Sequence, residues 1–113
     1  MDVGYVKNLL KNIGKELIIT SDKVKLKIEI THGLKFDDIA NQLLNPKALE
    51  AVEEQPSRTD NERTFRLIFK KSSQKRLCIV ITEKPDGTIF VVTAFESSKK
   101  LDKLVRTRWN KRR

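Results

Sequence analysis

The segment KVKLKIEITHGLKF, residues 23–36, decides the fold because its pattern fits two different elements. Charged and apolar residues alternate strictly from Lys23 to Ile30, which taken alone favours a half-buried strand. However, either Ser21 or Asp22 would serve as a helix N-cap, and Gly33 suits the left-handed residue that ends many helices. As a helix the segment would carry two opposed apolar stripes, Val24 with Ile28 and Leu26 with Ile30. Such a helix is stable when one stripe lies on a sheet and the other lies under another helix, here the first one.

Two other segments have the spacing of amphipathic helices. Residues 3–13 place apolar side chains on one side of a helix, and residues 36–44 do the same. Asp37 and Asp38 complement the dipole in the first turn of the second helix, and Pro46 stops it. We therefore expect one helix at the start of the chain and a short helix directly after residue 35.

Most of the predicted strands lie in the second half of the chain. Residues 63–70, 76–83 and 88–95 read as three antiparallel strands, joined by turns at 71–74 and 84–87. Residues 17–20 suit a short first strand, whereas residues 47–54 fit either a further helical turn or an irregular crossing. The predicted fold is α+β: an antiparallel sheet of about four strands with N-terminal helices on one face and a basic C-terminal helix, in the order α-β-α-α-β-β-β-α. It forms a single domain over 1–113, in which 1–14 is an added N-terminal helix and 98–113 is the basic one.

The charge of the chain is strongly positive and unevenly distributed. The 113 residues include 24 Lys and Arg against 15 Asp and Glu, a net charge of +9, and residues 98–113 carry eight basic residues and one acidic residue. This excess favours RNA or DNA, an acidic protein or an anionic membrane surface as a partner, although it also fits a merely well-solvated surface.

The chain has one cysteine and one histidine, so the sequence predicts no disulfide framework, no metal site and no other cofactor. Cys78 is expected to be an inert core residue. Without a recognisable signal peptide or membrane span, we expect a cytoplasmic protein and no membrane as a partner.

Residues 21–46 resemble the region around the Lys-His-Gly motif of BrnT-like proteins, small toxins of the RelE superfamily. In that family the motif lies on a helix, a left-handed stop and a second helix. The matching residues here are Lys27-Ile28, His32-Gly33-Leu34 and Phe36-Asp37-Asp38-Ile39. Asn61-Glu62-Arg63, Lys75-Arg76-Leu77 and Val92-Thr93-Ala94 extend the resemblance over about residues 17–105. The resemblance favours a helix over residues 22–32.

The resemblance implies a RelE-like ribonuclease that cuts RNA without a metal, through attack by the ribose 2′-hydroxyl. The candidate catalytic residues are His32, Arg63, Arg66, Arg76 and Thr93. His32 is the one side chain of a type whose unperturbed pKa suits acid–base work, although a histidine before a helix stop also fits a packing role. Arg63 and Arg66 alternate with core-facing Phe65, Leu67 and Phe69, so both arginines are expected on one sheet face, where they could grip a phosphate.

Three departures from the family pattern bear on activity. Thr31 stands where the family usually has Lys, Phe95 where it usually has Arg, and the last segment lacks the usual Tyr. Two hypotheses follow: a toxin-like endoribonuclease held by an acidic antitoxin protein, or a non-catalytic nucleic-acid-binding protein with the same fold. A pure protein-binding module is a third. The candidate nucleic-acid contacts are Lys27, Lys99, Lys103, Arg106, Arg108, Lys111, Arg112 and Arg113. Trp109 fits a core anchor better than a base-stacking platform.

Overall fold

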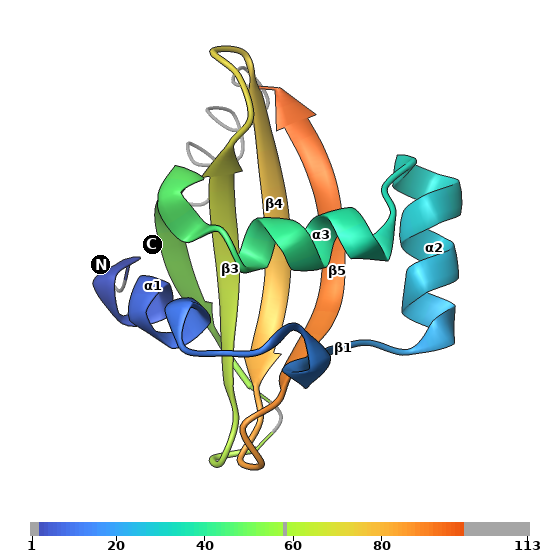
Figure 1. Cartoon of the computed structure of the whole chain (residues 1–113). Helices are drawn as coiled ribbons and strands as arrows, with labels where there is room; N and C mark the ends of the chain where they lie inside the picture. Colours follow the sequence, from blue (N-terminus) through green and yellow to red (C-terminus); the bar gives the residue numbers. More distant parts are fainter. Residues whose placement is uncertain (1–2, 58, 99–113) are drawn as a thin grey trace.

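The computed structural model describes residues 3–57 and 59–98, and its centre is a five-stranded sheet (Figure 1). Across the sheet the strands follow the order β1-β5-β4-β3-β2. Their bounds are β1 (Ile18–Ile19), β2 (Leu49–Gln55), β3 (Arg63–Lys70), β4 (Lys75–Glu83) and β5 (Ile89–Ser98). β1 pairs parallel with β5 and the other neighbours are antiparallel, so the sheet is mixed and the prediction of an antiparallel sheet is wrong at this edge.

The three strands predicted in the second half of the chain are confirmed as β3, β4 and β5, including the turns between them. In the second turn Gly87 has a φ of 88° and its N–H donates to the carbonyl of Lys84 at 3.1 Å. The sheet has five strands rather than about four because residues 49–55, left open between a helical turn and a crossing, form β2 at one edge. Leu49 and Val52 of β2 contribute to the core.

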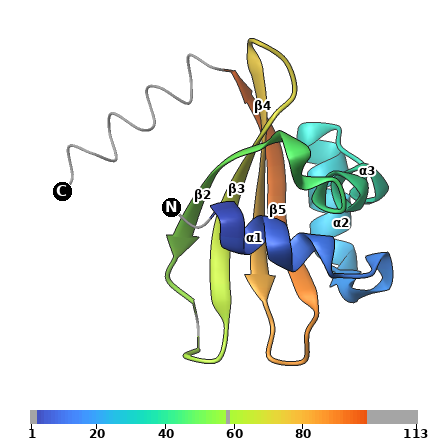
Figure 2. The ribbon, with the colours of Figure 1, turned by 60° about the vertical axis from the view of Figure 1, so that its left-hand side comes forward.

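Three α-helices precede the long strands: α1 (Val3–Lys11), α2 (Asp22–His32) and α3 (Phe36–Leu43), with 3-10 turns η1 (Lys15–Leu17) and η2 (Pro46–Ala48). In both ribbon views α1 and α3 lie on the same face of the sheet, and α2 stands at the β5 side (Figures 1 and 2). The core lies between these helices and the sheet. None of the described helices is long and apolar enough to cross a membrane.

The segment from residue 22 to residue 32 is a helix and not the strand that its alternation favours. Ser21 caps it, its Oγ accepting from the N–H of Val24 at 3.1 Å. Gly33 ends it with a φ of 64°, and its N–H donates to the carbonyl of Glu29 at 3.0 Å. The hydrogen-bonded caps at both ends therefore favour a helix here, although the period-2 alternation alone would predict a strand.

The expectation that α2 would be sandwiched is only half correct. Val24 and Ile28 pack on the core, and Ile28 is 1% exposed. The other stripe is not covered by α1, which packs against β2 and η2 instead. Leu26 is therefore 58% exposed and Ile30 is 74% exposed.

The predicted basic helix over 98–113 falls outside the described residues from residue 99 onward. Ser98 itself ends β5. The sheet thus leads directly into the most basic part of the sequence, which contains Lys99, Lys103, Arg106, Arg108, Trp109, Lys111, Arg112 and Arg113.

Candidate nucleic-acid interface

The long strands have two faces with different environments. Phe65, Leu67 and Phe69 of β3 are fully buried in the core on the face that α1 and α3 cover, called the helix face here. Because successive side chains of a strand point to opposite faces, Arg66 and Ile68 lie on the other one. We call this the Arg66 face; its side chains come from β2, β3, β4 and β5.

Arg66 occupies the middle of the Arg66 face. Its cross-strand partners are Glu53 of β2 and Val80 of β4, and Val80 in turn pairs with Thr93 of β5. The Nε of Arg66 is buried and has no hydrogen-bond partner in the described part of the chain. Glu53 stands opposite, yet no ion pair between these two described side chains is formed. Because this Nε–H is shielded from solvent, it can donate to an anion only when the neighbouring side chains move aside.

The surroundings of Arg66 are apolar on one side and rich in hydroxyls on the other. The next row of the register joins Ala51, Ile68, Cys78 and Phe95. The row on the other side of Arg66 carries a chain of hydroxyls: Ser57 Oγ donates to Thr64 Oγ1 at 3.1 Å, and the Thr64 and Thr82 hydroxyls lie 3.0 Å apart. Cys78 is buried, as expected for a core residue.

His32, at the end of α2, approaches this face through Phe95. The two ring centroids are 6.0 Å apart and the rings are tilted by 43°. His32 itself is exposed. The packing role considered for this histidine is therefore present, and the same contact brings its imidazole to the β5 side of the Arg66 face.

The expectation that Arg63 and Arg66 share one face is wrong. The two residues are three positions apart, an odd number, so their side chains point to opposite faces of β3. Arg63 lies on the helix face, where its guanidinium stacks at 4.8 Å from the Tyr5 ring centroid and 5.0 Å from that of Phe65. Both its Nε and a terminal nitrogen donate to Glu54, at 3.0 and 2.9 Å.

Arg63 therefore helps to attach α1 to the sheet. Tyr5 of α1 donates its hydroxyl to Glu83 Oε1 at 2.8 Å, and this hydrogen bond is the main reason that the pKa of Tyr5 is raised. The hydrogen bonds from Arg63 lower the pKa of Glu54, and the same bonds raise the pKa of Arg63. The guanidinium thus has a carboxylate and two aromatic rings as partners.

Arg76 lies on the Arg66 face, but its Nε and one terminal nitrogen are already engaged. Its Nε lies 2.7 Å from Glu50 Oε1, and a terminal nitrogen donates to the carbonyls of Ser72 and Lys75. The side chain is only 14% exposed. These contacts fasten the β3–β4 turn to β2.

Three of the five candidate catalytic residues, Arg66, Arg76 and Thr93, thus lie on the Arg66 face, with His32 at its border. Lys27 is exposed on α2 and is not part of the sheet face. The Arg66 face is less cationic than the net charge of the whole sequence suggests. Its charged strand residues are three cations and two carboxylates: Arg66, Lys70, Arg76, Glu50 and Glu53.

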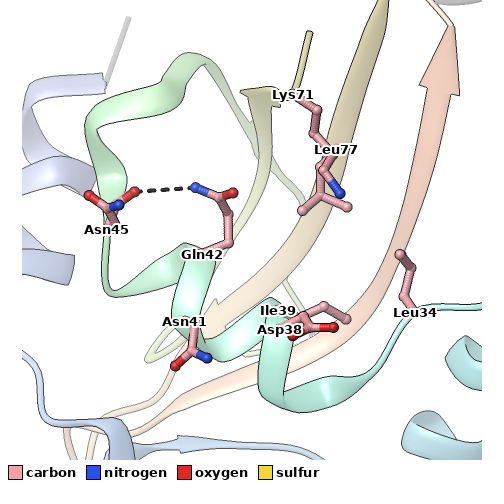
Figure 3. A pocket seen from close by; sticks show the side chains of 8 residues that line it. All are labelled: Leu34, Asp38, Ile39, Asn41, Gln42, Asn45, Lys71 and Leu77. Carbon is pink, nitrogen blue, oxygen red and sulfur yellow. Dashed lines mark hydrogen bonds between the residues drawn. The ribbon is translucent and has the colours of Figure 1, made fainter.

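A separate hollow of about 350 Å³ lies on the helix face, between α3 and the β3–β4 hairpin (Figure 3). Gln42 bridges part of its rim by donating to the carbonyl of Asn45 at 3.2 Å. Lys71 at the rim is paired with Glu96 at 2.9 Å. None of the candidate site residues lines it; the lining is Leu34, Asp38, Ile39, Asn41, Gln42, Asn45, Lys71 and Leu77.

Within residues 3–57 and 59–98 there is no group of three or more His, Cys, Asp or Glu side chains arranged to hold a metal ion. No family model matches the chain, and searches of curated proteins and of solved structures found no match either. The sequence and its geometry therefore carry the functional interpretation.

Sequence reasoning missed the carboxylates on this site. Glu50 and Glu53 belong to β2, a strand that the sequence pattern does not predict. Neither residue can therefore be placed beside Arg76 or Arg66 from the sequence. The sequence does predict, however, that Arg63 and Arg66 lie on opposite faces of the strand, because residues on one face are an even number apart.

Proposed function

We propose that the Arg66 face binds the sugar–phosphate backbone of RNA and that the chain is a toxin-like, metal-independent endoribonuclease acting at this face. The observation that carries the proposal is the Arg66 Nε–H, which is buried among side chains yet lacks a partner within the described chain. A guanidinium with a free donor is suited to a phosphate oxygen, since such charge-assisted bonds are short and strong. The BrnT-like motifs support the choice of RNA.

In this proposal the protein supplies charge stabilisation and one proton carrier. His32 takes the proton of the ribose 2′-hydroxyl, the 2′-oxygen forms a bond to phosphorus, and the bond to the 5′-oxygen breaks. The leaving 5′-oxygen receives a proton from the imidazolium or from water, and a 2′,3′-cyclic phosphate remains. Arg66 stabilises the charge that builds up on the phosphorane oxygens, and Thr93 donates a further hydrogen bond.

A second candidate function is non-catalytic binding of RNA or DNA by the same face. The observation that favours it is the pairing of Arg63 with Glu54 and of Arg76 with Glu50, which leaves fewer cations for a transition state than a nuclease of this kind would use. Residues 99–113 would add phosphate contacts without sequence selectivity. Both candidate functions are compatible with an acidic protein partner that binds the positively charged residues of the chain.

The test compares two arginines of one strand. Arg66→Met and Arg63→Met remove the same charge, keep an apolar stem and differ in the face from which the charge is lost. We expect Arg66→Met to weaken binding of a single-stranded oligoribonucleotide about 10- to 100-fold, the loss of one charged hydrogen bond. Arg63→Met should change binding by less than about threefold, provided that circular dichroism shows both variants folded. Equal losses would contradict the Arg66 face as the binding surface.

Cleavage is tested with the same RNA in excess EDTA. The nuclease proposal predicts fragments ending in a cyclic phosphate, and His32→Gln should abolish cleavage while leaving binding intact. Intact RNA with retained binding would select the second candidate, which also predicts that truncation after Ser98 weakens binding and flattens its dependence on salt. A chain that neither binds nor cuts RNA or DNA would overturn both.

A further inference from the structure

The outer stripe of α2 is the most exposed apolar feature of the described chain. Leu26 and Ile30 are 58% and 74% exposed, more than any other large apolar side chain described. They lie on the side of the helix opposite Val24 and Ile28, and α2 stands at the margin of the molecule (Figure 1). Two apolar residues one turn apart on a well-capped helix are a typical contact for another helix.

The charges beside this stripe are sorted by sign. With about 100° of rotation per residue, Lys23 and Lys27 flank the stripe on one side, and Asp22 and Glu29 flank it on the other. In heptad terms Leu26 takes position d, and both Lys23 and Ile30 take position a, where a single lysine is accepted at a cost in stability. Asp22 and Glu29 then occupy g, and Lys27 occupies e, the positions whose charges set the partner and direction of paired helices.

We propose that the outer stripe of α2 is the contact surface of a homodimer in which two α2 helices pack parallel about a two-fold axis. In the parallel arrangement the g position of one helix faces the e position of the other, so Asp22 of each copy meets Lys27 of its partner. In the antiparallel arrangement g faces g and e faces e, which brings carboxylates against carboxylates and lysine against lysine. The charges at positions e and g therefore favour a second copy as the partner and the parallel direction, although Lys23 at position a faces its counterpart and weakens the pair.

A second copy fits this surface better than an acidic helix of another protein does. An acidic helix would be attracted on the Lys27 side but repelled by Asp22 and Glu29 on the other side. The stripe is short, with two apolar residues per copy, and so falls below the roughly 800 Å² per partner of stable dimers. The dimer is accordingly a weak one that forms as concentration rises. It does not depend on the proposed binding of RNA.

The test is sedimentation of the full chain over a range of concentrations at 0.15 M salt. The wild type should shift from monomer toward dimer with increasing concentration. Ile30→Glu should remain monomeric throughout, whereas Thr31→Glu, the same charge change one residue away and off the stripe, should sediment as the wild type does. A wild type that stays monomeric up to millimolar concentration, or equal behaviour of the two variants, would overturn the proposal.

Charge reversal and cross-linking test the direction. Asp22→Lys and Lys27→Glu should each weaken the dimer, and the double variant should restore it, because the double variant again places opposite charges face to face. In addition, Ile30→Cys should form a disulfide-linked dimer rapidly on oxidation, since equivalent residues face each other only in the parallel pair. A double variant weaker than both single variants, or a cysteine variant that stays monomeric on oxidation, would contradict the parallel arrangement.

Discussion

The two sides of α2 have nearly the same chemistry and opposite environments. Val24 and Ile28 on one side, and Leu26 and Ile30 on the other, are all aliphatic residues spaced one turn apart. Ile28 is 1% exposed and Ile30 is 74% exposed. Apolar spacing therefore identifies which residues share a side of a helix, but the rest of the fold decides which side is covered.

The same contrast applies to β3, where neighbouring residues point to opposite faces. Arg63 on the helix face has Glu54, Tyr5 and Phe65 as partners. Arg66 on the other face has an Nε with no hydrogen-bond partner in the described residues. The contacts of Arg63 explain its place in the fold, whereas the Nε of Arg66 has no such contact.

The largest expected effect comes from truncating the two isoleucines of α2 separately. Ile28→Ala should lower the free energy of unfolding by about 2–5 kcal/mol, because it leaves a cavity between α2 and the sheet. Ile30→Ala should change it by less than about 0.5 kcal/mol, since that side chain is mostly in water. Urea denaturation at low micromolar concentration, where the proposed dimer dissociates, measures both.

Equal losses for the two variants would mean that the outer stripe is buried in solution. Repeating the measurement at high protein concentration sharpens the comparison. There the cost of Ile30→Ala should grow with concentration, and the cost of Ile28→Ala should not.

The element pattern of the second half of the chain was predictable because each strand is bounded by strong turn residues. The Lys84-Pro85-Asp86-Gly87 turn defines the β4–β5 hairpin from sequence, and Gly87 indeed has a positive φ. β2 could not be assigned, since Leu49–Gln55 carries three glutamates that disfavour a strand. Its pairing with β3 supplies the stabilisation that its own composition lacks.

The site was less predictable than the fold. Arg66 and Thr93 were identified individually, and their position on one row follows from the register of three strands. That register includes a bulge between Val80 and Ile81, which no local pattern in the sequence announces. The role of Arg63 depends on Tyr5 and Glu54, two residues from elements that meet only in the folded chain.

A smaller effect is expected from the two arginine variants when stability is measured. Arg63→Met should lower the midpoint of thermal unfolding by a few degrees, because it removes a bidentate ion pair and contacts with two rings. Arg66→Met should leave stability unchanged or raise it by up to about 1 kcal/mol, since a buried N–H without a partner is removed and the apolar stem is kept. Calorimetry of both variants tests this; a large loss for Arg66→Met would indicate a structural role.

The smallest effect is the pH dependence that the Arg63–Glu54 pair gives to folding. The pKa of Glu54 is lowered in the folded chain by the hydrogen bonds from Arg63. A carboxyl with a lowered folded-state pKa stabilises the fold at pH values above its ordinary pKa, and this contribution is lost as the pH falls through the folded-state value. Glu54→Gln should therefore be less stable than the wild type at pH 7, and the difference in the free energy of unfolding should narrow toward pH 3.

Glu53→Gln is the matched control, because it removes the same charge from the neighbouring residue on the other face, where no ion pair with Arg66 is formed. Urea denaturation at several pH values measures the two gaps. If the stability difference from the wild type narrows equally in both variants, the effect comes from net charge. If it narrows in Glu54→Gln alone, the effect comes from the Arg63–Glu54 ion pair on the helix face.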